Sequence, residues 1–190
     1  MDWQIENHLG VPQFQAVLPA CVLAPMVEAA ISVIPEKVSE SRFKGALLHI
    51  RDAAAVMVAT DGCRLVHVES SASMNDTWGQ FTSVVPWKAL QQIKNALSDK
   101  PDATIEVATG KANLHFHVDQ HYFNVERSND WFPDYSRVLR DDYPNAAILN
   151  SDRFRKAMNR VASDDAPCVR LQFLPGEIIF NIGSATGEFE

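Results

Sequence analysis

Three histidines and one aspartate within seven consecutive positions are the first candidates for chemistry: His115, His117, Asp119 and His121. Imidazole and carboxylate groups bind a metal when several of them converge on one ion at roughly 2 Å. Here His115 and His117 alternate with apolar residues, which places both on the polar face of one predicted strand, and His121 follows a turn. Solvated surface histidines are the favoured interpretation, and no metal is predicted.

Other catalytic signals are absent from the sequence. It has no phosphate-binding loop, no G-x-S-x-G turn, no H-E-x-x-H motif and no cysteine pair of zinc spacing. Cys21, Cys63 and Cys168 are odd in number and far apart, which favours reduced thiols in a cytoplasm. The longest apolar stretch is broken by prolines and too short to cross a bilayer. We therefore expect a cytoplasmic protein without catalytic residues, cofactor or membrane contact.

Two predicted helices carry lysines and arginines that could contact a polyanion. On the later helix the cations recur at i, i+3 and i+7, opposite apolar residues. Such a stripe attracts phosphates without reading base sequence, although an ordinary solvated helix face is the alternative. The net charge of −7 excludes neither, because the local field decides. The cations are Lys88, Lys94, Arg153, Lys156 and Arg160.

Three segments that share one pattern must position these side chains. Each has an apolar strand end, then Pro19, Pro86 or Asn150, then an amphipathic helix, at spacings of 67 and 64 residues. Proline suits the first helical turn and asparagine can cap a helix. Pro25 either lies in the first turn of a helix that starts near Val22 or kinks that helix. Expected buried residues are Leu90, Ile93 and Leu97 on the second helix and Phe154, Ala157, Met158 and Val161 on the third.

Runs with a period of two follow each helix and predict strands. They indicate an α+β fold of repeated β-α-β-β-β units, with helices packed on antiparallel sheets. The third unit lacks its last strand, and the unfinished sheet edge predicts self-association. The predicted strands are residues 44–50, 54–60 and 64–70, then 103–109, 112–118 and 121–127, then Val169–Leu174 and Glu177–Ile182.

Two segments resemble the bacterial DNA sliding clamp, the beta subunit of DNA polymerase III. Val58–Leu65 (VATDGCRL) is similar to that family's ATDGHRL turn, and Phe132–Leu139 (FPDYSRVL) to its FPDYRRVLP linker. Val85–Lys88 (VPWK) is similar to its VPRK. Cys63 stands where the family usually has His, and Trp87 replaces a basic residue. The resemblance predicts an N-terminal segment (1–14), a middle-type clamp domain (15–137) and part of a last-type domain (138–190).

The resemblance implies the DNA-clamp fold and a non-enzymatic processivity factor that tethers DNA polymerase or other partners to duplex DNA. The helices of such a ring face the DNA, so the helix cations above would be DNA-facing. The family also captures clamp-binding-motif proteins in a pocket between its middle and last domains, although a packed interdomain seam would use the same residue types. The matching positions are Phe43, Thr60, Gly62, Cys63, Arg64, Leu65, Pro133, Arg137 and Val138.

The number of repeats leaves several readings open. A clamp ring of this family has twelve units, whereas this sequence encodes two units and part of a third. The chain is either a fragment of a longer clamp gene or a small paralogue, and four chains would close a ring through head-to-tail contacts. The alternative function is a paralogue that captures clamp-binding peptides, or the clamp itself, and regulates replication. An enzyme or a remnant is the third possibility.

Overall fold

The computed structural model describes residues 14–34, 43–51, 54–70, 80–98, 100–110, 112–126, 132–139, 142, 144–161 and 168–183. The chain divides into two compact units, Met1–Pro133 (unit 1) and Asp134–Glu190 (unit 2). The sequence-based boundary lay four residues later, after residue 137.

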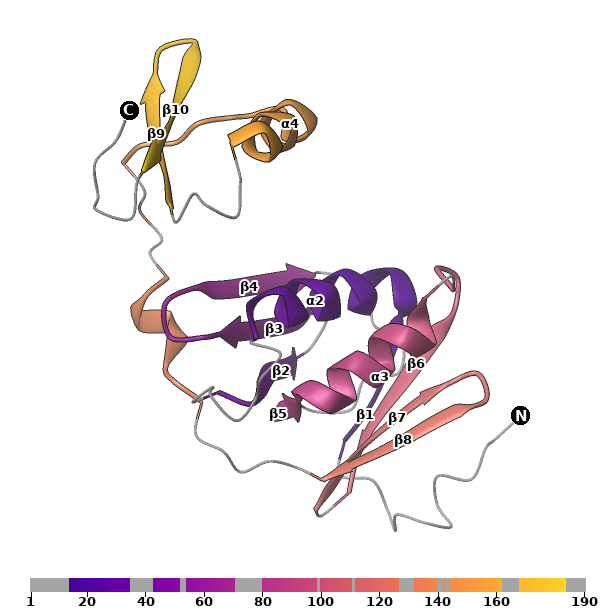
Figure 1. The fold of residues 1–190 in the computed structure, drawn as a ribbon. Helices are drawn as coiled ribbons and strands as arrows, with labels where there is room; N and C mark the ends of the chain where they lie inside the picture. Colours follow the sequence, from indigo (N-terminus) through magenta and orange to yellow (C-terminus); the bar gives the residue numbers. More distant parts are fainter. Residues whose placement is uncertain are drawn as a thin grey trace. The chain divides into compact units, whose positions relative to one another are not determined.

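Helices and antiparallel sheets make up both units, as Figure 1 shows, and the predicted α+β class is confirmed. Unit 1 contains β1 (Phe14–Pro19), α2 (Ala20–Val33), β2 (Gly45–Arg51), β3 (Ala54–Thr60), β4 (Leu65–Ser70), β5 (Phe81–Pro86), α3 (Trp87–Leu97), β6 (Thr104–Thr109), β7 (Asn113–Val118) and β8 (His121–Glu126). Unit 2 contains the short 3-10 helix η1 (Tyr135–Arg137), α4 (Ser151–Val161), β9 (Cys168–Leu174) and β10 (Glu177–Gly183).

The two repeats of unit 1, β1–β4 and β5–β8, exchange their first strands. The sheets have the orders β4-β3-β2-β5 and β1-β6-β7-β8, so each repeat donates one strand to the sheet of the other. In both exchanges the proline at the end of the donated strand lies opposite the first residue of the receiving strand: Pro19 opposite Thr104, and Pro86 opposite Gly45. Sequence periodicity predicts the strands but carries no information about this exchange.

Both helices of unit 1 begin directly after these prolines. Pro19 and Pro86 have extended backbone angles and still belong to their strands, so the prediction that they lie within the first helical turn was wrong by one residue. Proline suits this position because its N–H is missing where a strand ends and no helical bond is due. Pro25 lies inside α2, past its first turn; the helix starts two residues earlier than the sequence suggested.

The backbone N–H of the first residue of each helix donates a hydrogen bond to the residue just before the receiving strand. Ala20 N donates to Ala103 O at 2.8 Å, and Trp87 N donates to Lys44 O at 2.9 Å. Ala103 and Lys44 immediately precede the receiving strands, so the two bonds are equivalent. Helix start and strand exchange are therefore fixed together.

The core of unit 1 lies between the two helices and the two sheets. α2 and α3 run side by side across the strands (Figure 1). Leu90, Ile93 and Leu97 are buried as predicted, and Leu23 and Met26 occupy the matching face of α2. Burial of one such side chain stabilises the fold by about 2 kcal/mol.

The polar face of β7 differs from the prediction. His115, expected in solvent, is only 2% exposed. Its Nδ1 lies 2.8 Å from the hydroxyl of Tyr122 on the neighbouring strand β8. Burial lowers the pKa of His115 and raises the pKa of Tyr122. Alternation predicts two faces of a strand, but the neighbouring strand decides whether the polar face meets water.

After η1, unit 2 contains α4 and the β9–β10 hairpin. Asn150 caps α4 as predicted, because its Oδ1 accepts the N–H of Arg153 at 3.0 Å. Phe154 and Phe180 contact each other with ring centroids 5.8 Å apart, which joins α4 to β10. The four apolar residues of α4 expected in the core, Phe154, Ala157, Met158 and Val161, are only partly buried. No helix within the described ranges is long and apolar enough to cross a membrane.

Candidate functional site

The turn between β3 and β4 is organised by the carboxylate of Asp61. Its Oδ1 accepts the backbone N–H groups of Cys63 (2.9 Å) and Arg64 (2.7 Å), and its Oδ2 accepts Arg64 Nε at 2.9 Å. The backbone hydrogen bonds, Arg64's first, and then the Arg64 side chain lower the pKa of Asp61 to about 2. A carboxylate held this way keeps the turn in one conformation.

Thr60 adds two hydrogen bonds on the buried side of the turn. It is buried, and its Oγ1 donates to Arg64 O at 2.7 Å while accepting Gly62 N at 3.0 Å. Gly62 has φ +95, which favours glycine. The result is a rigid turn that presents Cys63 and Arg64 to solvent, both of them exposed.

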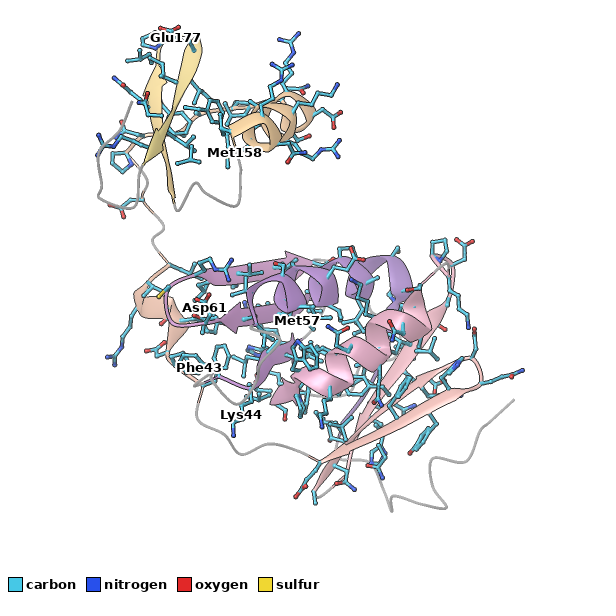
Figure 2. The ribbon with its side chains drawn as sticks, in the orientation of Figure 1. Phe43, Lys44, Met57, Asp61, Met158 and Glu177 are labelled. Carbon is cyan, nitrogen blue, oxygen red and sulfur yellow. The ribbon has the colours of Figure 1, made fainter. Side chains whose placement is uncertain are left out.

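An aromatic pair lies against this turn. A Cβ placed on Gly62 would lie 3.9 Å from Phe43 Cε2, so the ring of Phe43 lies next to the turn. The rings of Phe43 and Phe132 have centroids 6.2 Å apart at 51°, a tilted aromatic contact. Figure 2 shows Phe43 and Asp61 at the same end of unit 1. Phe43, Gly62 and Phe132 thus form one patch, called the aromatic patch below.

The FPDYSRVL segment, at the start of unit 2, contains a similar Asp–Arg pair. Asp134 Oδ2 accepts Arg137 Nε at 3.0 Å and Asp134 Oδ1 accepts Ser136 Oγ at 2.6 Å. These hydrogen bonds, Ser136 first, lower the pKa of Asp134. Val138 follows η1 and is 63% exposed.

The nine candidate pocket positions divide between the two units. Unit 1 brings together Phe43 with the Thr60–Leu65 turn, and Arg137 and Val138 belong to unit 2. Leu65 and Pro133 are half-buried. Phe132 was not among the predicted pocket residues, although it is the first residue of the FPDY segment. Its contact with Phe43 depends on the fold and could not be predicted from sequence.

The candidate DNA-facing cations differ in exposure. Lys88 is exposed on α3, whereas Lys94 is half-buried. Arg153, Lys156 and Arg160 are exposed on α4 and, within the described part of the chain, form no ion pair. A fourth cation on α4 was not among the candidates: Arg155 pairs with Asp152 at 2.9 Å.

Charge is distributed unequally between helices and strands. α2, α3 and α4 together carry six lysines and arginines against two acids, Glu28 and Asp152. The ten strands carry two arginines against four glutamates. The helices are therefore net positive in a chain of net charge −7. α2 itself has no lysine or arginine, so the positive charge comes from α3 and α4.

The histidines near residue 117 contact neighbouring side chains of the same sheet. His115 contacts Tyr122, His117 Nδ1 lies 3.6 Å from Glu106 Oε2, and His121 stacks on Phe123. Asp119 pairs with Lys100 at 2.7 Å. Among the described residues, no three His, Cys, Asp or Glu side chains are grouped to hold a metal ion.

Comparison with known proteins identifies one family. A family model for the DNA polymerase III beta subunit, central domain, matches residues 18–134. The beta sliding clamp of Chlamydia pneumoniae is 26% identical over 165 residues, covering 85% of this chain and 44% of that protein. That of Escherichia coli K12 is 25% identical over 169 residues, covering 81% and 43%. The chain thus spans less than half the length of these relatives.

Solved structures agree on the fold. A DNA polymerase sliding clamp from Pseudomonas aeruginosa superimposes with a TM-score of 0.79 at 19% identity, covering 95% of this chain and 50% of that one. The DNA polymerase III beta subunit of Thermotoga maritima gives a TM-score of 0.80 at 18% identity, covering 100% and 52%. Because the family model matches more than half of the chain, in the strand-exchanged unit, this chain belongs to the DNA polymerase III beta-subunit family, the sliding clamps, through its central domain.

Proposed function

We propose that this chain is a sliding-clamp-like processivity factor of DNA replication, which tethers DNA polymerase or other partners to duplex DNA without sequence specificity. The observation that carries the proposal is the concentration of positive charge on the helices. Family membership supplies the context, and the expected location is the cytoplasm.

The helix cations can be ranked by comparing the exposure of corresponding positions in the three repeats. Positions 67 and 131 residues apart correspond along α2, α3 and α4. Lys88 corresponds to Cys21 and Asp152, and all three are exposed. Lys156 corresponds to Pro25 and Gln92, which are also exposed.

The remaining α4 cations occupy positions that unit 1 covers more. Arg153 corresponds to Ala89 and Arg160 to Ala96, and both alanines are buried. We therefore assign the leading DNA contacts to Lys88 and Lys156, with Arg153, Arg160 and Lys94 secondary.

The number of cations limits the strength of the DNA contact. Each neutralised phosphate contributes about −0.9 to the log–log salt slope, so six helix cations allow at most about −5. Such a weak grip suits enclosure of DNA by a ring, where topology rather than affinity retains the protein. Ring closure then requires further subunits or a partner protein.

Fluorescence anisotropy on a short duplex tests the helix surface. The double variant Lys88→Gln/Lys156→Gln should reduce the magnitude of the salt slope by about 1.8, the contribution of two phosphates. Arg51→Gln/Lys100→Gln is the matched control, because it removes equal charge from residues outside the helices that are paired with Glu69 and Asp119. An equal loss in both variants contradicts a helix-borne DNA surface.

Retention on circular DNA tests tethering itself. The labelled chain, incubated with singly nicked plasmid, should stay with the DNA through gel filtration and dissociate after linearisation. Retention that is unaffected by linearisation indicates simple binding and contradicts enclosure.

A second function is favoured by the aromatic patch. We propose that Phe43, Gly62 and Phe132 receive an apolar anchor of a clamp-binding peptide, with the exposed Arg64 beside them. A related P. aeruginosa clamp has been solved bound to griselimycin. If the chain is a regulatory paralogue, it binds a clamp-motif peptide without DNA retention. Phe132→Ala should abolish peptide binding, whereas Phe173→Ala, which removes an exposed aromatic ring of unit 2, should not.

A further inference from the structure

An open pocket lies between the end of α2 and the beginning of α3, the two helices that lie side by side in Figure 1. Its volume is about 550 Å³, which is in the range of pockets that hold a small ligand or one group of a larger ligand. All of its lining residues belong to unit 1. They are Ile31, Ile34, Trp87, Lys88, Gln91 and Gln92.

Three of these residues give the pocket an apolar wall. Ile31 is half-buried and Ile34 is buried, both at the end of α2. Trp87 is half-buried and packs against the core. Its Nε1 is buried and has no hydrogen-bond partner among the described residues, so the exposed part of the indole consists of ring carbons. An aromatic surface of this kind binds another flat ring by stacking.

Two amides and one cation surround the apolar wall. Gln91 is half-buried and Gln92 is exposed. A glutamine amide both donates and accepts hydrogen bonds, as do the groups on the edge of a nucleobase. Lys88 is exposed, and no acidic side chain is among the residues that line the pocket. The one acid of α2, Glu28, lies a turn before Ile31.

The other repeat of unit 1 forms the same fold without these side chains. Trp87 corresponds to Ala20, 67 residues earlier, and both donate the equivalent backbone hydrogen bond. The other three lining residues of α3 correspond to residues of α2 that have neither an amide nor a charge: Cys21, Ala24 and Pro25. The aromatic ring, the two amides and the lysine of α3 are therefore not required by the strand exchange.

We propose that this pocket binds an unpaired base of single-stranded DNA, with a neighbouring phosphate at Lys88. The base stacks on Trp87, and the amides of Gln91 and Gln92 form hydrogen bonds with its edge. The inference rests on the proposed function, and it adds a preference for DNA with unpaired bases, such as gaps and primer ends, over continuous duplex.

The chemistry of the pocket favours an unpaired base over two other occupants. A base within a duplex is already stacked and paired, so its extrusion into the pocket costs free energy, whereas a single strand offers its bases directly. An apolar peptide side chain would contact Ile31 and Trp87 but would use neither the amides nor Lys88. A base with its phosphate uses the ring, the amides and the cation together.

Fluorescence anisotropy with two labelled strands tests recognition of bases. One strand is oligothymidylate of about 12 nucleotides, and the other has the same backbone with stable abasic sites in place of the bases. The full 190-residue chain should bind the thymidine strand at least about fivefold more tightly, which is the contribution of one stacked base. Equal affinities, or no binding of either strand, overturn the proposal.

Substitution of Trp87 locates the base in this pocket. Trp87→Leu should remove most of the preference for the thymidine strand, whereas Trp87→Phe, which keeps an aromatic ring, should retain it. Because Trp87 packs against the core, circular dichroism and urea unfolding check that each variant is folded. An unchanged preference in folded Trp87→Leu means that the bases bind elsewhere and contradicts the proposal.

A matched pair of amide substitutions avoids the core. Gln92→Ala should weaken binding of the thymidine strand by about threefold, the contribution of one hydrogen bond, without weakening binding of the abasic strand. The control is Asn95→Ala, because Asn95 is an exposed amide one turn later on α3 that does not line the pocket. Equal effects of the two substitutions contradict the proposal.

Free thymidine monophosphate distinguishes a DNA strand from a free nucleotide. It should compete only weakly, because it lacks the phosphate contacts of a longer strand, and competition at the concentration of the strand itself overturns the assignment to DNA. All of these measurements use single strands. A negative result here therefore leaves the duplex and circular-DNA tests of the proposed function unaffected.

Discussion

The two units place the same local pattern in different surroundings. Leu23 in α2, Leu90 in α3 and Phe154 in α4 are equivalent residues of the three repeats. In unit 1 they are 1% and 0% exposed, whereas Phe154 is only partly buried. The helices of unit 1 each cover a sheet and contact each other. In contrast, α4 contacts the β9–β10 hairpin through the ring pair described above. Within unit 1, therefore, each repeat completes its core beside the other.

The strongest test of this comparison is truncation at equivalent positions. Leu90→Ala should cost about 2–5 kcal/mol of unfolding free energy, as for a fully buried leucine. Phe154→Ala should cost roughly half as much, because solvent already reaches its site. All four tryptophans belong to residues 1–133, so urea unfolding followed by tryptophan fluorescence measures unit 1, and hydrogen exchange measures α4.

Equal losses of unfolding free energy at the two positions would contradict this difference between the units. A Phe154→Ala cost that rises with protein concentration would instead mean that association buries the residue.

A smaller effect is expected at the strand exchange itself. A Cβ on Gly45 would collide with the carbonyl oxygen of Val85, a backbone atom of β5. Gly45→Ala should therefore open the β2–β5 ladder and cost about 1–3 kcal/mol, as overpacking does. The control is Gly176→Ala in unit 2, where φ is +83 and no atom lies within 4 Å of the new Cβ.

Urea titration with tryptophan fluorescence distinguishes these glycines. Gly45→Ala should lower the midpoint of the unit 1 transition, whereas Gly176→Ala should leave it unchanged. A shift with Gly176→Ala would mean that the units unfold together.

The smallest effect concerns the two Asp–Arg turns, one in each unit. Asp61 accepts two backbone N–H groups in addition to arginine, whereas Asp134 is held mainly by the side chains of Ser136 and Arg137. NMR titration should find the pKa of Asp61 at about 2 and that of Asp134 closer to the ordinary value of 3.8. Identical pKa values for the two would contradict the assigned causes.

The sign of the pH dependence follows from the lowered pKa of Asp61. Its carboxylate stabilises the turn fully above the ordinary value of 3.8, and this contribution is lost as the pH falls towards about 2. Amide protection of Cys63 and Arg64 should therefore persist at acid pH until Asp61 is protonated. Asp61→Asn, which lacks the charge, should reduce protection at neutral pH as well.

The candidate sites were only partly predictable. Helix cations such as Lys88 and Lys156 follow from periodicity, since the apolar face of a helix determines its polar face. The turn at Asp61–Gly62 follows from residues that lie next to each other. The contact between Phe43 and Phe132 does not, because a pair so far apart in sequence depends on the path of the chain between them.

The repeated helices and strands, the helix starts near Pro19, Pro86 and Asn150, and the buried face of α3 could all be predicted from sequence. These features depend on interactions between residues a few positions apart, so local pattern is sufficient. Three features follow from the three-dimensional fold alone: the strand exchange between the repeats, the contact of Tyr122 with His115, and the partial burial of the apolar face of α4. The physical reason is that backbone hydrogen bonds are alike along every strand edge. The choice of partner therefore depends on which edges and apolar faces the rest of the fold brings together.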